Sequence, residues 1–163
     1  MTHAFVGLGA NLGDARATVE AALEALARLP ATRLIARSSL YVSAPLDATG
    51  ADFVNAVAAL DTELEARTLL TELQGIERSH GRERPYRNAP RTLDLDLLLF
   101  GDACFADSAL TVPHPRMTQR AFVLQPLAEI APELRLPDGR AVASLLPALA
   151  GQRLTRMPLR PSP

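Results

Sequence analysis

The hydrophobic and polar positions in the first part of the chain predict a strand, a helix and a second strand. Apolar residues run over residues 3–8, which is typical of a buried strand, and a turn-rich segment follows directly. Asp14 stands where it can cap a helix whose apolar residues recur at helical spacing over residues 19–29. Over residues 32–42 the period changes to two, which predicts one half-exposed strand with Tyr41 on its polar face.

The middle of the chain predicts a third strand, a second helix and a fourth strand. Residues 43–52 carry proline, glycine and aspartate and predict a loop, after which the apolar residues 53–60 resume a strand. Apolar positions over residues 69–76 form one stripe of a helix, and Gly81 stands where a helix commonly ends. An arginine-rich segment over residues 81–89 then leads to a leucine-rich strand within residues 89–101.

The order of these elements predicts an α+β fold of the ferredoxin-like kind, with a βαββαβ core. In that arrangement two helices bury one face of an antiparallel sheet and the other face stays open. Beyond residue 101 the pattern is looser, with a helix predicted over residues 119–130 and a short helix over residues 142–149. We expect these C-terminal additions to belong to a single domain over residues 1–163, because a chain of this length typically forms one core.

Two aspartates interrupt the leucines of the strand predicted within residues 89–101. Because successive side chains of a strand alternate between its faces, Asp94 and Asp96 share the open face while the leucines face the helices. Two carboxylates so placed suit divalent cations such as magnesium, which prefer oxygen ligands. The alternative is that both aspartates lie on a solvated face and pair with nearby arginines.

Four arginines lie within residues 82–91, just before the two carboxylates. They are Arg82, Arg84, Arg87 and Arg91. Carboxylates beside guanidinium groups suit a polyphosphate, because cations bridge its oxygens and arginines take up the remaining charge. The chain has no lysine, which excludes the lysine-containing phosphate loop. Taken alone, the arginine-rich segment also fits a charged surface turn.

Charge and composition favour a small partner over nucleic acid or a membrane. The 17 basic and 18 acidic residues nearly cancel, so no positive field gathers nucleic acid or anionic lipid. No apolar run approaches the roughly 20 residues that would cross a bilayer, and no signal segment is recognisable. The single cysteine, Cys104, excludes an internal disulfide and fits a reducing compartment. We therefore expect a cytoplasmic protein, acting as a monomer.

The segment Arg87-Asn-Ala-Pro-Arg-Thr-Leu-Asp-Leu-Asp-Leu-Leu98 closely resembles the signature of the 6-hydroxymethyl-7,8-dihydropterin pyrophosphokinase family of the folate pathway. The resemblance runs over nearly all of the chain, and further matches include Gly7-Leu-Gly-Ala-Asn-Leu-Gly13, Asp52-Phe-Val-Asn55 and Leu110-Thr-Val-Pro-His114. It implies a ferredoxin-like fold and the transfer of diphosphate from ATP to 6-hydroxymethyl-7,8-dihydropterin, with AMP as the second product.

The resemblance also implies which residues hold ATP. Asp94 and Asp96 would bind two magnesium ions that hold the phosphates. Arg82 and Arg91 would contact phosphate oxygens. Arg84 and Arg87 would lie in a mobile loop that closes over the site. The residues along the nucleotide would be Gln74, Thr111, His114 and Arg120.

For the pterin, the resemblance implies an aromatic sandwich between Phe53 and Phe122. Asn55 and the backbone of Ser43 and Leu46 would meet the polar edge of the ring. Stacking suits a flat heteroaromatic ligand whose orientation is fixed by a few polar groups. Asn55 is the more telling residue, because an amide in an otherwise apolar strand must find hydrogen-bond partners, whereas either phenylalanine alone is more often a core residue.

Two other functions fit parts of the pattern. The residues alone do not separate attack on the β-phosphorus from γ-phosphoryl transfer or metal-assisted hydrolysis, so a metal-dependent phosphohydrolase is the enzyme alternative. An RNA-binding module is the non-enzyme alternative, but such modules present a basic, aromatic sheet face and this one carries aspartates.

Four positions depart from the pattern of some family members: Asn88, Ala89, Ala109 and Pro115.

Overall fold

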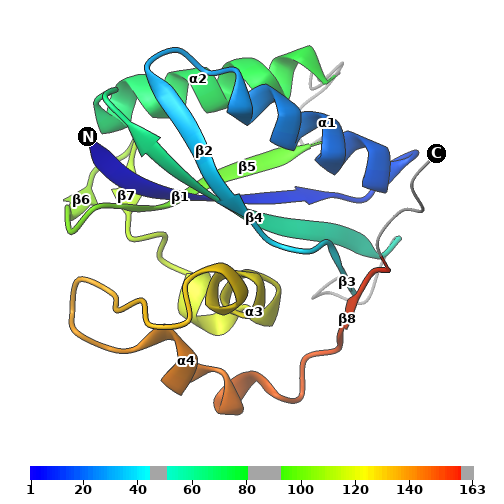
Figure 1. Cartoon of the computed structure of the whole chain (residues 1–163). Coiled ribbons are helices and arrows are strands. Elements are labelled where there is room, and N and C mark those ends of the chain that lie inside the picture. Colours follow the sequence, from blue (N-terminus) through cyan, green and yellow to red (C-terminus); the bar gives the residue numbers. More distant parts are fainter. Residues whose placement is uncertain (45–50, 81–92, 159–163) are drawn as a thin grey trace.

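The computed structural model describes residues 1–44, 51–80 and 93–158, and a six-stranded antiparallel sheet organises them (Figure 1). The strands run in the order β5-β1-β4-β3-β8, and β2 also pairs with β4. The strands of the sheet are β1 (Thr2–Ala10), β2 (Thr32–Arg37), β3 (Tyr41–Ser43), β4 (Phe53–Thr62), β5 (Asp94–Phe100) and β8 (Leu154–Arg156). The helices are α1 (Ala15–Ala27), α2 (Ala66–Ser79), α3 (Ala121–Ile130) and α4 (Val142–Leu145). Short elements complete the described chain: β6 (Phe105–Ala106), β7 (Thr111–Val112) and two 3-10 turns, Met117–Gln119 and Pro147–Leu149.

Helices α1 and α2 cover one face of the sheet, as the apolar periodicity predicts (Figure 1). Asp14 caps α1, because its carboxylate accepts the N–H of Ala17 at 3.0 Å. The main core lies between these helices and the sheet, where Leu23 and Leu69 are fully buried with Leu95 of β5. Burial of such side chains is the principal stabilising term for the layer.

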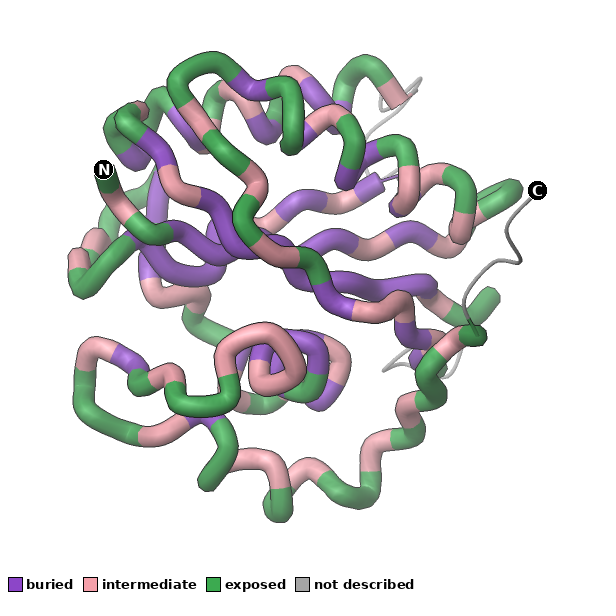
Figure 2. Tube along the Cα trace, viewed as in Figure 1, coloured by how far each residue is buried: buried purple, intermediate pink, exposed green. Residues whose placement is uncertain are grey.

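The opposite face of the sheet is not open along its whole length, so that expectation was wrong in part. Helices α3 and α4 pack on it and enclose a second core, in which Val57 of β4 and Leu124 of α3 are fully buried (Figure 1). Strand β4 is therefore buried at almost every position, as the continuous purple of the central strands shows (Figure 2). Only the part of this face that α3 leaves uncovered can receive a ligand.

A bulge in β5 separates the end of the strand that carries the two aspartates from the end that packs into the core beneath α3. Phe5 of β1 pairs with Leu99 and Val6 pairs with Leu97, so Leu98 is an extra residue in the ladder. As a result Leu98 and Leu99 both enter the core beneath α3, and the alternation that places Asp94 and Asp96 on one face ends before them. The carboxylates are at one end of the strand and the apolar residues at the other.

The single strand expected over residues 32–42 is two strands in the structure. Ser38 lies between β2 and β3, and its buried hydroxyl accepts the N–H of Val57 at 2.9 Å and donates to the carbonyl of Ser39 at 2.7 Å. This side-chain bonding interrupts the alternation, as serine commonly does. Tyr41 is consequently buried beneath α3, where its hydroxyl donates to Glu129 at 2.7 Å, and not exposed as its position in the pattern predicted.

The buried phenol of Tyr41 makes the stability of the fold sensitive to alkaline pH. Burial, aided by Glu129, raises the pKa of Tyr41 above its usual value of 10.0, although Arg156 acts in the opposite direction. The folded protein thus holds the phenol proton more tightly than the unfolded chain does. Its stabilisation is complete below about pH 10 and is lost as the pH rises through the folded-state pKa.

We therefore expect Tyr41→Phe to remove part of the alkaline loss of stability. Urea unfolding should be followed from pH 8 to pH 11 in both proteins. The free-energy difference between them should be constant up to about pH 10 and should shrink above it. A difference that stays constant over the whole range would contradict this assignment.

Within residues 1–44, 51–80 and 93–158, no helix is long and apolar enough to cross a membrane.

Candidate active site

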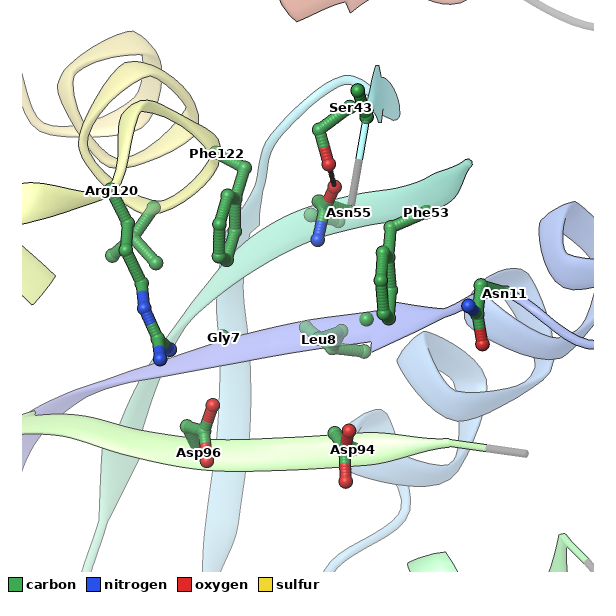
Figure 3. Close-up of a pocket in the computed structure, with 14 residues that line it drawn as sticks. Gly7, Leu8, Asn11, Ser43, Phe53, Asn55, Asp94, Asp96, Arg120 and Phe122 are labelled. Atoms are coloured by element: carbon green, nitrogen blue, oxygen red, sulfur yellow. Dashed lines mark hydrogen bonds between the residues drawn. The ribbon is translucent and has the colours of Figure 1, made fainter. Parts of the chain in front are cut away.

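A cavity of about 470 Å³ lies on the uncovered part of the sheet, beside the start of α3 (Figure 3). Strands β1, β3, β4 and β5 and helix α3 all contribute to its walls. The cavity brings together predicted residues from distant parts of the chain: Ser43, Phe53, Asn55, Asp94, Asp96, Arg120 and Phe122.

Two glycines of β1 form the floor of this cavity. Gly7 pairs with Val57 on one side and Asp96 on the other, while Gly9 pairs with Asn55 and Asp94. Since side chains of one face recur every second residue, glycine at both positions leaves the centre of the sheet bare. The sequence interpretation missed this floor because it ended the strand at residue 8, whereas β1 continues to Ala10. Two glycines spaced by two within a strand were the available signal.

Asn55 supplies a fixed polar group at the inner edge of the cavity. The residue is 4% exposed, and its Oδ1 accepts the hydroxyl of Ser43 at 2.6 Å (Figure 3). With the oxygen so engaged, the Nδ2 group lies toward Gly9, and a Cβ on that glycine would be 3.3 Å from Nδ2. The amide is therefore held in one orientation as a donor. Ser43 orients this amide through its side chain, a role that the sequence did not predict.

Two phenylalanines stand on opposite sides of this amide. Phe53 begins β4, Phe122 is the second residue of α3, and Figure 3 shows their rings facing each other across the cavity. The guanidinium carbon of Arg120 lies 5.5 Å from the centroid of the Phe122 ring. Two rings with a gap between them can hold a flat heteroaromatic molecule by stacking on both of its faces.

Asp94 and Asp96 lie together on the other edge of the cavity, on β5 (Figure 3). Their shared face confirms the alternation predicted from the sequence. The Nε2 atom of His114 is 4.0 Å from an oxygen of Asp96, and its Nδ1 accepts the backbone N–H of Arg116 at 3.2 Å. Burial lowers the pKa of His114, although the charge of Asp96 acts in the opposite direction. The imidazole is then neutral near pH 7 and carries its proton on Nε2, toward the carboxylate.

Asp94 and Asp96 fit a divalent cation that is also held by another molecule. Among the residues that the structure describes, no group of three or more histidine, cysteine, aspartate or glutamate side chains gathers as a complete metal site. Two carboxylates in an accessible cavity supply part of an oxygen shell, and magnesium typically completes such a shell with water and the phosphates of a substrate. The donor set therefore suits magnesium bound together with a polyphosphate.

Buried Glu77 supports this strand from the helix side of the sheet. It is 4% exposed on α2, and its Oε2 accepts the N–H of Leu95 at 2.8 Å. Leu95 is the residue between the two aspartates. A buried carboxyl oxygen that accepts this N–H holds the backbone of β5 from the helix side, which the leucine-rich pattern did not reveal.

Other predicted site residues lie away from the cavity walls or outside the described ranges. Gln74 is exposed on α2, and Thr111 of β7 is exposed and donates to the carbonyl of Asp107 at 3.3 Å. His114 reaches the site only through its approach to Asp96. Five predicted residues lie outside the described part of the chain: Leu46, Arg82, Arg84, Arg87 and Arg91.

Sequence comparison places the chain beside named pyrophosphokinases. A family model described as 7,8-dihydro-6-hydroxymethylpterin-pyrophosphokinase (HPPK) matches residues 5–132. A 2-amino-4-hydroxy-6-hydroxymethyldihydropteridine pyrophosphokinase of Pseudomonas aeruginosa is 53% identical over 155 residues, which cover 94% of this chain and 96% of the relative. The protein of the same name in Haemophilus influenzae is 42% identical over 158 residues, covering 96% and 99%.

Comparison of folds finds similar solved structures of HPPK-DHPS proteins. A crystal structure of HPPK-DHPS in complex with substrates has a TM-score of 0.71 at 13% sequence identity, over 90% of this chain and 43% of that one. Wild-type Plasmodium falciparum HPPK-DHPS with pteroate has a TM-score of 0.71 at 14% identity, over 91% and 42%. The chain thus spans less than half of either structure, and at this identity the likeness concerns the fold. The sequence matches establish that the chain belongs to the 7,8-dihydro-6-hydroxymethylpterin-pyrophosphokinase family and transfers diphosphate from ATP to a hydroxymethyldihydropterin in folate synthesis.

Proposed function

We propose that the cavity holds the pterin between Phe53 and Phe122 and the phosphates of ATP beside Asp94 and Asp96. The observation that carries this proposal is that one cavity presents two facing rings, a fixed amide and two carboxylates. The first three suit a flat heterocycle and the last two suit a metal-bound polyphosphate. A diphosphate transfer needs both at one place.

At the pterin end, stacking supplies affinity and hydrogen bonds supply orientation. A ring pair is worth about 0.5–1.5 kcal/mol beyond the area it buries, so two faces of stacking contribute appreciably to binding. Asn55 and the backbone of Ser43 and Leu46 would bind the polar edge of the pterin. Because Ser43 already engages the Asn55 oxygen, the amide meets the ligand without first losing conformational freedom.

At the phosphate end, Asp94 and Asp96 would hold two magnesium ions bound to ATP. Such ions would neutralise the charge that builds on the phosphate oxygens during transfer. The neutral His114 can donate from Nε2, and Arg120 brings a positive charge to the same side of the cavity. We place Gln74 and Thr111 along the nucleotide, with Arg82 and Arg91 on the phosphates and Arg84 and Arg87 over them.

The reaction that this arrangement supports is an in-line displacement at the β-phosphorus. The hydroxymethyl oxygen of the pterin forms a bond to that phosphorus, and the bond from it to the oxygen that bridges to the α-phosphorus breaks. AMP departs with the bonding electron pair, and the hydroxyl proton is released to solvent. Positioning and electrostatic stabilisation supply most of the acceleration in such transfers, so no side chain is assigned as a strong base.

The products of a defined mixture test this proposal. The protein should be incubated with ATP, magnesium and 6-hydroxymethyl-7,8-dihydropterin, and the nucleotides and pterins separated by chromatography. We expect AMP and the pterin diphosphate in equal amounts, with neither formed when magnesium is removed by a chelator. Release of ADP would indicate γ-phosphoryl transfer, and free phosphate without a pterin product would indicate a phosphohydrolase; either result would contradict the proposal.

The architecture is also part of the proposal. The order β5-β1-β4 with β2 beside β4, crossed by α1 and α2, supports the ferredoxin-like core. Pairing of β8 with β3 supports one domain over residues 1–163, since the C-terminal segment completes the sheet. We further propose a cytoplasmic monomer that binds neither nucleic acid nor membrane, and light scattering would measure its mass in solution against the 17.5 kDa of the chain.

A further inference from the structure

We infer that Glu129, which lies outside the cavity walls, is a positioning residue for the pterin site. Its carboxylate holds α3 against β3 and thereby sets the gap between the rings of Phe122 and Phe53. This inference rests on the proposed binding of the pterin between those two rings.

Both oxygens of Glu129 are engaged by donors on the segment that leads into β3. Oε1 accepts the hydroxyl of Tyr41 at 2.7 Å and the N–H of Ser39 at 3.1 Å. Oε2 accepts the same N–H at 3.0 Å and the hydroxyl of Ser39 at 2.9 Å. Burial raises the pKa of Glu129, but these hydrogen bonds outweigh it and hold the pKa below its usual value. The carboxylate is therefore ionised at neutral pH, and each of its oxygens accepts hydrogen bonds.

The helix transmits this contact to Phe122. Glu129 and Phe122 are seven residues apart on α3, which is about two turns, so their side chains leave the same side of the helix. Near the end of the helix, Glu129 is hydrogen-bonded to β3. At its start, Phe122 presents its ring to the cavity (Figure 3). A shift or rotation of α3 as a unit therefore moves Phe122 together with Glu129.

The strand transmits the contact to the opposite wall. Within the β3–β4 ladder, Tyr41 pairs with Asn55 and Ser43 pairs with Phe53. Tyr41, which Glu129 binds, thus belongs to the strand pair that carries the second ring and the amide. One carboxylate joins both walls of the proposed pterin site.

Arg156 contributes less to this junction. Its guanidinium is 3.1 Å from an oxygen of Glu129 and 5.8 Å from the centroid of the Tyr41 ring. The arginine side chain is 57% exposed, and ion pairs in contact with solvent are typically weak. The hydrogen bonds from Ser39 and Tyr41 are therefore the principal restraint.

Glu129→Gln tests the inference with almost no change of shape. The N–H of Ser39 lies 3.1 Å from Oε1 and 3.0 Å from Oε2, so in either orientation the amide NH₂ group of the variant faces this donor. We expect the KM and the Kd for the pterin to rise about tenfold, the effect of losing one charged hydrogen bond, while kcat and the KM for ATP change less than about twofold. The matched control is Glu133→Gln, which removes the same charge from an exposed residue just beyond α3 and should leave all of these constants unchanged.

A double-mutant cycle shows whether Glu129 acts through Phe122. Glu129→Gln should weaken pterin binding in the natural protein and should have little further effect in a Phe122→Ala background. Thermal melting should show that each variant is folded at the assay temperature. Additive effects in the cycle, or equal losses in pterin and ATP affinity, would assign Glu129 a merely structural role and overturn the inference.

Two further outcomes separate this inference from the proposed function. If Phe122→Ala weakens pterin binding and Glu129→Gln does not, only the role of Glu129 is wrong. If Phe122→Ala and Phe53→Ala both leave pterin binding unchanged, the pterin does not bind between the rings, and both proposals are wrong.

Discussion

Replacing Asp96 with asparagine is expected to lower kcat by about a hundredfold to a thousandfold, the loss typical when one stabilising group at developing charge is removed. The amide keeps the shape of the side chain but loses the negative charge that attracts a cation. Asp96 lines the cavity, and its carboxylate lies 4.0 Å from His114. AMP formation at saturating ATP and pterin measures the effect, and thermal melting confirms that the variant is folded.

The control for this change lies two residues beyond the end of the same strand. Asp102→Asn removes an identical charge from an exposed residue in the turn after β5, outside the cavity walls. It should leave AMP formation within about twofold of the natural rate, as expected of a surface charge. Near-normal turnover in Asp96→Asn would exclude the assignment of magnesium to this carboxylate pair.

Adding one methyl group to the floor of the cavity is expected to weaken pterin binding about tenfold or more. The Cβ of Gly9→Ala would lie 3.3 Å from the Nδ2 atom of Asn55, closer than most such contacts. To relieve it, the amide must move from the orientation that Ser43 fixes, and a misplaced polar group costs at least about one hydrogen bond of binding energy. Titration of the protein with the pterin, followed by fluorescence, measures the change.

Gly7→Ala is the matched comparison for Gly9→Ala. It adds the same methyl group to the same face of β1, two residues away, where the nearest atoms are those of the Leu98 side chain at 3.4 Å and beyond. Because that contact is ordinary van der Waals packing, Gly7→Ala should weaken pterin binding less than Gly9→Ala does. Equal effects would indicate that the crowding acts through the floor in general and not through Asn55.

Much of the fold could be predicted from local pattern. Asp14, the helical stripes and the alternation around Asp94 and Asp96 are consequences of short-range periodicity and capping, and the structure has them where expected. The position of α3 could not be predicted in this way, because periodicity within a helix does not specify which face of the sheet the helix covers. Tyr41 was misplaced for a related reason: the hydroxyl of Ser38 bonds the backbone and interrupts the alternation.

In the candidate site, too, the residues set by local pattern could be predicted from it, and those set by long-range packing could not. The two carboxylates could be identified because charged residues are unusual within a leucine-rich strand. Gly7 and Gly9 could not be identified, because a glycine in a strand indicates the floor of a cavity only when the neighbouring strands are known. Phe122 and Phe53 are far apart in the sequence, so local pattern does not pair them. The family resemblance predicted the pair, and the packing of α3 beside β4 brings their rings face to face.

Strand β8 has a consequence for the behaviour of the chain among its own copies. By pairing with β3, the last described strand occupies backbone donors and acceptors that would otherwise form an unpaired edge beside Ser43. Unpaired edges recruit strands from other molecules and promote aggregation. The edge of the sheet is then β8 itself, and a strand of only three residues offers little backbone for intermolecular pairing.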